Sequence, residues 1–367
     1  LYAVDTGRLS FHSNMLTVFT GIIPPCSQIG DDGGVTTPGH MTAAVTKRHG
    51  GPDALEVHHD WLVPRPLAGQ VLVRVKAAAL NNTDIWSREG SYGMASDPDA
   101  TVGWKGTPLD FPIIQGIDIC GEVQSLGEGV DASWLGKRVI VDPIVEYRDG
   151  TAARIAGSET DGGFAQYHLC AVAQLRDVSD SRLTDAQLAC LPCAYGTALG
   201  MINRGRCGAG ERVVVTGASG GVGLAAVQLL VARKCQVVAR TSSAHAKLLE
   251  AQGATELSLR DSDDTSAVDP VDAVIDVVGG PEFGGWLDRL VVGGRLVVAG
   301  AVAGPLVEVD LRRIYLEQRQ LIGSTMHSPD DFAELAAIAT EAVPGGAGVD
   351  PVVAAEYPLS SIHEAQH

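Results

Sequence analysis

The stretch VVVTGASGGVGLAAVQLL, residues 213–230, decides the fold class of this chain. It begins with a β-branched run typical of a parallel strand that is buried on both faces. Four glycines follow within seven residues, and apolar residues from Val222 to Leu230 then recur at helical spacing. Glycine permits positive φ and leaves no Cβ between backbone and ligand, while the first turn of a helix offers unpaired N–H groups to an anion. The pattern favours a pyrophosphate site, and a tight turn without a ligand is the alternative.

The chain downstream alternates short apolar runs with helical segments. The first strand is expected at 212–216. Further strands are expected at 236–240, 256–259, 271–280, 293–300 and 319–325, and helices at 222–230, 243–252 and 283–290. Six strands joined by helical crossovers predict a doubly wound parallel sheet, in which the turn after the first strand binds a dinucleotide.

The chain upstream differs in composition from this sheet. Residues 41–170 contain short β runs separated by Gly, Pro and Asp, and this pattern predicts a β-rich module. Residues 183–202 predict a helix with a proline interruption that crosses between the two parts. A cleft between two such domains is the usual place for a small substrate beside a cofactor.

Length and charge narrow the class of function. A chain of 367 residues is expected to form two domains. The net charge of −17 and the lack of a basic cluster argue against nucleic-acid binding. No apolar run is long enough to span a bilayer, and no secretory signal is evident, so we expect no membrane partner. Seven scattered cysteines favour reduced thiols and a cytoplasmic location.

Several motifs, taken in order, carry a resemblance to a known family. They are GQVLVRVKAAALNNTD (69–84), FPIIQGIDICGEVQSLGEGV (111–130), GKRVIVDP (136–143), DGGFAQYHL (161–169), LPCAYGTALGMI (191–202) and the glycine-rich stretch above. From about residue 41 onward the chain resembles the medium-chain dehydrogenase/reductase superfamily, in particular its zinc-independent quinone oxidoreductase-like members. The resemblance implies an α/β protein with a GroES-like β-rich catalytic domain and a doubly wound, Rossmann-type cofactor domain.

The resemblance also implies domain limits. Residues 41–172 and 326–367 are expected to form the catalytic domain, and residues 173–325 the cofactor domain. Residues 1–40 lack periodicity and are expected to lie outside the fold, with a functional N-terminal arm as the alternative. The sequence PLSSIHEAQH (358–367) begins the helix that precedes the closing strand in relatives. Without that strand, we expect an unpaired sheet edge and reduced stability.

The positions of metal ligands in zinc-dependent relatives carry other residues here. They read Asn81, Ile117 and approximately Ala189, none of which binds zinc. The segment 142–163, which corresponds to the structural zinc lobe, contains no cysteine. Cys190 and Cys193 form a C-x-x-C pair without a second pair, a pattern that favours core packing over a metal site. We therefore expect no zinc.

Without a Lewis acid, hydrogen-bond donors must polarise a substrate carbonyl. By resemblance, Asn81 and Thr83 lie on the segment that faces the nicotinamide, and Tyr92 follows within reach, so these three are the candidate catalytic residues. The alternative for Asn81 is that it caps a helix together with Asp84. Asp118 replaces the glutamate of relatives and is expected to be structural.

The end of the second strand suggests which cofactor binds. NAD-selective proteins carry an acidic residue there, whereas this chain has Arg240, Thr241 and Ser242, followed by Lys247. These cations and hydroxyls suit a 2′-phosphate, so we expect NADP(H), with direct binding by Arg240. The alternative is a solvated Arg240 and a Ser242 that caps the next helix. The remaining expected cofactor residues are Thr197, Ser219, Gly220, Gly221, Val222, Val278 and Gly300.

Together these features predict an NADPH-dependent oxidoreductase that transfers hydride to a small carbonyl, enone or quinone. A nucleotide-binding protein with a structural or adaptor role is the alternative. The long segment 93–112 is a candidate lid, and its Trp104 a candidate wall of the substrate site or an incidental exposed residue. By resemblance we also expect a homodimer formed through residues 290–304.

Overall fold

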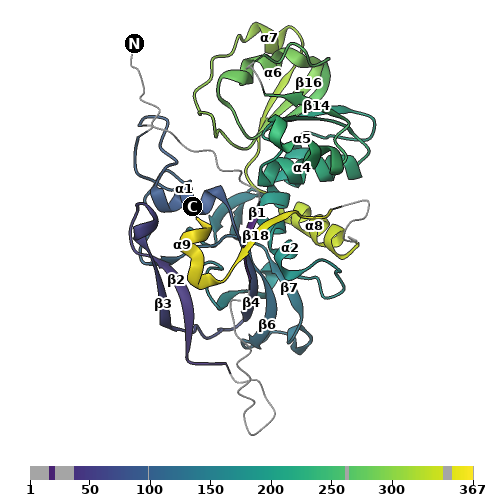
Figure 1. Ribbon diagram of the computed structural model, residues 1–367. Helices are drawn as coiled ribbons and strands as arrows, with labels where there is room; N and C mark the ends of the chain where they lie inside the picture. The colour runs from purple at the N-terminus through teal and green to yellow at the C-terminus, as the bar shows by residue number, and fades with distance from the viewer. Residues whose placement is uncertain (1–15, 21–36, 98, 261–263, 342–348, 367) are drawn as a thin grey trace.

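The computed structural model describes residues 16–20, 37–97, 99–260, 264–341 and 349–366 of the chain. It divides into two halves, each built around its own sheet (Figure 1). The chain completes most of the β-rich half, crosses to the parallel sheet, and returns with β18 (Val353–Tyr357) and α9 (Ile362–Ala365). No helix among the described residues is both long and apolar enough to cross a bilayer.

The cofactor half is a six-stranded, entirely parallel sheet with the order β14-β13-β12-β15-β16-β17. This order is the doubly wound arrangement predicted from the sequence. The first strand of this half, β12, lies at the centre, and the strand order runs outward from it in both directions, to β13 and β14 on one side and to β15, β16 and β17 on the other. The strands are β12 (Arg212–Val215), β13 (Gln236–Thr241), β14 (Glu256–Leu259), β15 (Val271–Asp276), β16 (Leu290–Val298) and β17 (Gln320–Gly323). The helices are α4 (Gly221–Ala232), α5 (Ala246–Ala251), α6 (Phe283–Arg289) and α7 (Arg312–Tyr315).

Buried apolar side chains cover both faces at the centre of this sheet. Val213 and Val215 belong to the large core formed with α3 and α4, and Val214 belongs to a second core with Trp286 of α6. A strand buried on both sides carries no polar alternation, which explains the uninterrupted valines of β12.

The β-rich half contains a seven-stranded sheet of order β11-β7-β6-β4-β1-β18, with β10 also paired to β4. A three-stranded sheet of order β3-β2-β5 and a β8–β9 hairpin complete it. Its strands are β1 (Leu16–Thr20), β2 (His40–Thr46), β3 (Leu55–Leu62), β4 (Gln70–Leu80), β5 (Ile113–Ile114), β6 (Cys120–Leu126), β7 (Arg138–Val141), β8 (Ile144–Arg148), β9 (Thr151–Ile155), β10 (Tyr167–Ala171) and β11 (Leu175–Asp177). Helix α1 (Asn82–Glu89) follows β4.

The crossing segment forms two helices around a distorted turn. Helix α2 (Asp185–Ala189) leads into a π-helical turn, Leu191–Tyr195, and then into α3 (Gly196–Arg204). Pro192 lies in that turn, as expected for a residue that cannot supply a regular helical hydrogen bond. Helix α8 (Pro329–Glu341) packs against α3 on the return path.

Strand β1 corrects one sequence prediction. It pairs antiparallel with β4 and parallel with β18, and β18 has no other strand partner among the described residues. Residues 16–20 therefore belong to the fold, and β18 is the last strand of its sheet, joined to it through β1. The prediction is wrong for these residues because the partners of a five-residue strand lie far away in the sequence. Residues 1–15 and 21–36 lie outside the described part of the chain.

Candidate functional site

The carboxyl ends of four parallel strands bring together most of the predicted cofactor residues. Ser219 to Val222 follow β12, Arg240 and Thr241 end β13, Val278 follows β15, and Gly300 follows β16. In an open parallel sheet this edge, beside the central strands, is the ligand side. The spatial grouping agrees with the predicted cofactor set.

The glycine-rich turn is shaped for a close ligand. Gly217 has a φ of +56°, and a Cβ on Gly223 would lie 2.1 Å from the Gly217 carbonyl oxygen, so that position requires glycine. Gly220 is the N-cap of α4 and offers no side chain to cap it. The first-turn N–H groups of α4 therefore stay available, and the half-exposed turn fits a pyrophosphate at a helix N-terminus.

Arg240 does not have the role predicted for it. Its side chain is 3% exposed, and Nη2 and Nε donate to the two carboxylate oxygens of Glu282 at 2.8 and 3.1 Å. Nη1 donates to Ser258 Oγ and to the Leu259 carbonyl oxygen, at 3.1 and 2.7 Å. The guanidinium thus holds β13, β14 and the start of α6 together. Its donors are engaged inside the protein, so direct binding of a 2′-phosphate by Arg240 is wrong.

The residues that follow β13 are more accessible than Arg240 and Thr241, which belong to the strand. Thr241 is buried, and its hydroxyl has no hydrogen-bond partner in the part of the chain that the structure describes. Ser242 Oγ lies 3.1 Å from His245 Nδ1, and Lys247 is exposed without an ion pair to any described residue. Arg260, which the sequence analysis missed, is also exposed, and its backbone N–H donates to the Thr241 carbonyl. Arg260 lies near the end of β13 because β14, which precedes it in the sequence, pairs with β13.

The other predicted cofactor residues lie where backbones approach closely. A Cβ on Gly300 would lie 2.7 Å from the Val277 carbonyl oxygen, so glycine is needed beside Val278. Thr197, in α3, is buried, and its hydroxyl lies 3.6 Å from the Met326 sulfur.

Asn81 is held by two carboxylates at the start of α1. Its backbone N–H donates to Asp84 Oδ2 at 2.8 Å, and its side-chain Nδ2 donates to Asp118 Oδ2 at 2.9 Å. Asn81 is the N-cap of α1 and Asp84 binds its backbone N–H, but the Asn81 side chain makes no capping hydrogen bond, and its carboxamide bonds to Asp118 instead. Asp84 Oδ1 also accepts the Ile117 N–H, and Asp118 Oδ1 accepts the Cys193 N–H at 2.6 Å.

These two carboxyl groups are buried, and neither forms an ion pair with a residue that the structure describes. Burial raises the pKa of Asp84 to about 7, against hydrogen bonds from the Asn81 and Ile117 backbones that lower it. Burial also raises the pKa of Asp118 well above its usual range, and the charge of Asp84 adds to this, while the bonds from Asn81 and Cys193 oppose it. The site therefore contains two carboxyl groups whose ionisation depends on these few hydrogen bonds.

The structure also brings Thr83 and Tyr92 together. Their hydroxyl oxygens are 2.5 Å apart, and the Tyr92 ring lies edge-on to Trp86 at a centroid distance of 5.9 Å. Burial raises the pKa of Tyr92 to about 12, with smaller upward contributions from Cys193 and Asp84, while the bond to Thr83 lowers it. Tyr92 thus retains its proton at neutral pH and can act as a donor.

An apolar cluster surrounds this polar group. Ile117, Ile144, Ile155, Cys193 and Met326 form it, with Trp104, Tyr147 and Ala152 packed against them. Cys193 shares this cluster with Ile117, whereas Ala189, which the resemblance placed near the third metal-ligand position of relatives, is buried in the other core. Among the described residues, no group of three or more His, Cys, Asp or Glu is arranged to hold a metal ion.

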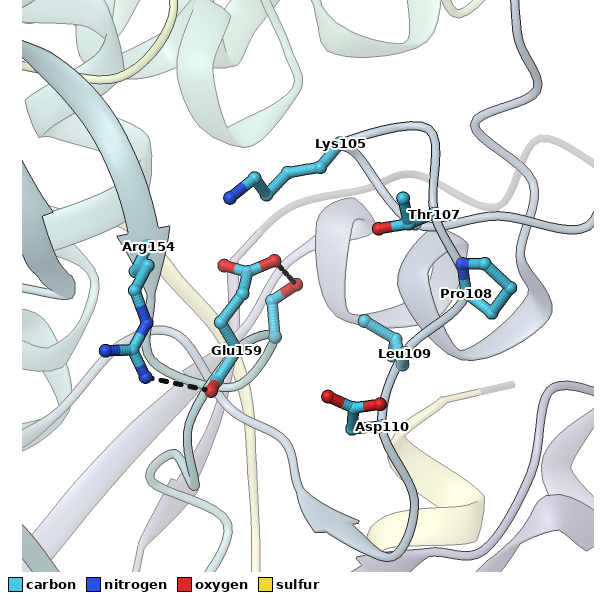
Figure 2. Close-up of a pocket in the computed structure, with 9 residues that line it drawn as sticks. Lys105, Thr107, Pro108, Leu109, Asp110, Arg154 and Glu159 are labelled. Carbon is cyan, nitrogen blue, oxygen red and sulfur yellow. Dashed lines mark hydrogen bonds between the residues drawn. The ribbon is translucent and has the colours of Figure 1, made fainter. Parts of the chain in front are cut away.

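Segment 93–112 is tied to the β8–β9 hairpin through Glu159. Trp104 Nε1 and Ser158 Oγ donate to Glu159 Oε1 at 3.0 and 2.9 Å, and the Ile155 N–H donates to Oε2. Lys105 Nζ donates to the Ala153 carbonyl. A cavity of about 240 Å³ opens beside Glu159, with Lys105 and Arg154 on its rim (Figure 2). These hydrogen bonds therefore hold the candidate lid, segment 93–112, against β9 and the segment that follows it. Trp104 packs against the apolar cluster.

A buried hydrogen-bond network that the sequence analysis missed holds Tyr147, which packs against the same apolar cluster as Trp104. Asp142 Oδ2 accepts the Tyr147 hydroxyl at 2.8 Å, and Oδ1 lies 3.0 Å from His327 Nε2. His327 is fully buried, stacks on Phe332 of α8, and follows the last strand of the cofactor half. Burial and the adjacent Asp142 raise the pKa of Tyr147 above its usual range, so this phenol keeps its proton. The network fixes Tyr147 across the junction of the two halves.

Comparison with known proteins agrees with this architecture. Residues 67–180 match the alcohol dehydrogenase GroES-like domain, and residues 221–341 match the family described as zinc-binding dehydrogenase. A quinone oxidoreductase of Rattus norvegicus is 30% identical over 336 residues, which cover 89% of this chain and 92% of the relative. An acryloyl-coenzyme A reductase of Metallosphaera sedula is 30% identical over 277 residues, covering 71% and 77% of the two chains.

Solved structures of alcohol dehydrogenases are also similar to this chain. The crystal structure of a putative alcohol dehydrogenase from Sinorhizobium meliloti shares 41% identity with a TM-score of 0.84, covering 90% of this chain and 93% of that one. A thermostable alcohol dehydrogenase from Pyrobaculum aerophilum has a TM-score of 0.73 at 28% identity, covering 88% and 94%. With its GroES-like half, its parallel cofactor sheet and these relatives, the chain belongs to the medium-chain dehydrogenase/reductase superfamily of oxidoreductases.

Proposed function

We propose that this chain is a zinc-independent, NADPH-dependent oxidoreductase that reduces a small carbonyl, enone or quinone. The observation that carries the proposal is the group of uncharged donors beside the apolar cluster: the Asn81 carboxamide and the Thr83–Tyr92 hydroxyl pair. A nicotinamide cofactor would supply the hydride. The protein would bind the apolar body of the substrate against Ile117 and Trp104, and would hydrogen-bond its oxygen through these donors.

The preference for NADPH rests on the end of β13. The chain has no carboxylate there to bind both ribose hydroxyls, and exposed Lys247 and Arg260 supply positive charge next to Ser242. A 2′-phosphate suits these cations. Replacing Lys247 by alanine should weaken NADPH binding by about 1.5–3 kcal/mol and leave NADH binding nearly unchanged. Fluorescence titration of both nucleotides measures this difference.

Turnover tests the proposal as a whole. We expect the protein to oxidise NADPH in the presence of at least one class among quinones, enones, aldehydes and enoyl thioesters. The relatives include a quinone oxidoreductase and an acryloyl-coenzyme A reductase, so the panel must contain both classes. No turnover with any substrate, together with intact nucleotide binding, would instead support a structural or adaptor role.

The strand expected at the dimer interface, within residues 290–304, is not at an edge, because β16 pairs with both β15 and β17. We therefore propose a homodimer that forms through the β17 edge of the cofactor sheet. β17 is the last strand of its sheet, and large apolar side chains near it are exposed: Val292, Leu306, Leu311, Tyr315, Leu316 and Leu321. Apolar surface gathered at an open strand edge favours association with a second copy. Light scattering should give twice the chain mass for the native protein and the single mass for Leu321→Lys. A native monomer at micromolar concentration would reject this interface.

A further inference from the structure

The Asn81 carboxamide makes its one side-chain hydrogen bond to a described residue through Nδ2, which donates to Asp118. The carboxyl group of Asp84 is its other polar neighbour, and the Asn81 side chain makes a small contribution that lowers the pKa of that group. Asn81 is half-buried, so its second N–H and its Oδ1 remain reachable. The direction of the carboxamide therefore depends on what Asp118 accepts.

In its ionised form, Asp118 can only accept hydrogen bonds at this position. Oδ2 receives the Asn81 Nδ2–H and Oδ1 receives the Cys193 N–H, so both of its neighbours are donors. A carboxylate has two acceptor oxygens, whereas an amide has one acceptor and one donor group. Asp118 thereby excludes the flipped carboxamide of Asn81, in which two acceptors would face each other.

The location of Asp118 makes this control rigid. Its side chain is fully buried, and no Lys or Arg among the described residues forms an ion pair with it. Its second bond reaches Cys193 in the π-helical turn, next to the apolar cluster. One side chain thus fixes Asn81 relative to the wall against which a substrate would lie.

We propose that Asp118 is the positioning residue of the reaction: it orients the Asn81 carboxamide so that a free N–H meets the substrate oxygen. This inference rests on the proposed function and adds to it the residue that sets the geometry. Asp118 does not touch the substrate, and it acts through Asn81.

Four proteins test this inference: the native chain, Asp118→Asn, Asn81→Asp, and the double variant with both changes. In Asp118→Asn, the new amide keeps the Cys193 bond through its oxygen and turns its N–H group toward Asn81. The Asn81 carboxamide must then flip, which moves its free donors. We expect kcat to fall about 10- to 100-fold while KM changes less than threefold.

The double variant separates positioning from structural support. The carboxylate introduced at position 81 would accept from the amide introduced at position 118, so the buried pair forms again with its polarity reversed. The melting temperature should therefore return toward the native value. A carboxylate at position 81 has no N–H to offer, so kcat should stay low. Recovery of kcat together with the melting temperature would overturn the inference, as would an Asp118→Asn protein with kcat within twofold of native.

The controls keep the two proposals apart. Asp180→Asn changes an exposed carboxylate that has no hydrogen bond or ion pair to a described residue, and it should leave all parameters unchanged. NADPH affinity should be equal in the native chain and Asp118→Asn, because Asp118 is fully buried and is not one of the predicted cofactor residues. Loss of turnover in the native chain as well would reject the proposed function rather than this inference.

Discussion

Replacing Arg240 by alanine should destabilise the protein without changing its preference between NADPH and NADH. The guanidinium is 3% exposed, and its partner Glu282 is 9% exposed. The substitution removes two donors to Glu282, one bond to Ser258 and one to the Leu259 carbonyl. Among the described side chains, Glu282 would keep the indole N–H of Trp286 as a donor, at 3.2 Å.

The size of the effect follows from the uncompensated charge. Removing one member of a buried ion pair costs about 3–5 kcal/mol, because the other charge stays in a poorly solvated place. Typical unfolding free energies are about 5–15 kcal/mol, so this loss is a large fraction of the total. The double variant Arg240→Met with Glu282→Gln should recover part of the loss, because neither residue then carries a buried charge.

Urea denaturation and nucleotide titration measure the two effects. Arg313→Ala is the matched control, since Arg313 forms an ion pair with Asp288 at 3.1 Å but is half exposed. Its loss should cost less than about 1 kcal/mol. If Arg240→Ala retains native stability and loses NADPH affinity at least tenfold more than NADH affinity, then Arg240 binds the cofactor directly, and its structural assignment is refuted.

Three further changes have defined outcomes. Deleting residues 1–36, or introducing Val18→Pro, should lower the unfolding free energy, because β18 is joined to its sheet through β1; equal urea midpoints would show that this pairing is dispensable. Asp84→Asn should reduce the pH dependence of the melting temperature. The pKa of Asp84 in the folded protein is about 7, so the stability that its protonated form contributes is present below about pH 4 and is lost as the pH rises through 7. The melting temperature of the native protein relative to that of the variant should therefore fall between about pH 4 and pH 7. Trp104→Phe, which removes the N–H bound to Glu159, should raise KM for bulky substrates more than it lowers kcat, and identical kinetics across the substrate panel would exclude a role for this contact.

The cofactor half could be predicted because its signals are local. Each strand is a short apolar run, and the glycine turn needs residues without a Cβ within seven positions. The contact between Gly223 and the Gly217 carbonyl lies entirely inside that motif. Strand order then follows from the handedness of crossovers, which leaves few alternatives. Sequence reasoning therefore identified the sheet, its doubly wound parallel class and the glycine turn.

The site could be predicted only in part. Asn81 and Thr83 lie at the start of α1 and Tyr92 lies shortly after its end, and the family resemblance pointed to this short segment. Asp118 and Cys193 reach the same place from the segment before β6 and from the crossing segment, and their roles appear only when those segments meet.

Arg240 and β1 show why a residue type alone does not assign a role. An arginine at the end of the second strand suits a phosphate as well as a buried carboxylate, and the choice depends on Glu282, 42 residues away in the sequence. The short run of residues 16–20 likewise suits a solvent-exposed linker or a strand, and the choice depends on unpaired backbone groups of β4 and β18. Once Glu282 holds Arg240, the charge available for a 2′-phosphate must come from Lys247 and Arg260, whose side chains remain exposed. Cofactor preference in this chain should therefore respond to substitutions in the loop after β13 and at the end of β14, and not to the strand residue that the sequence pattern indicates first.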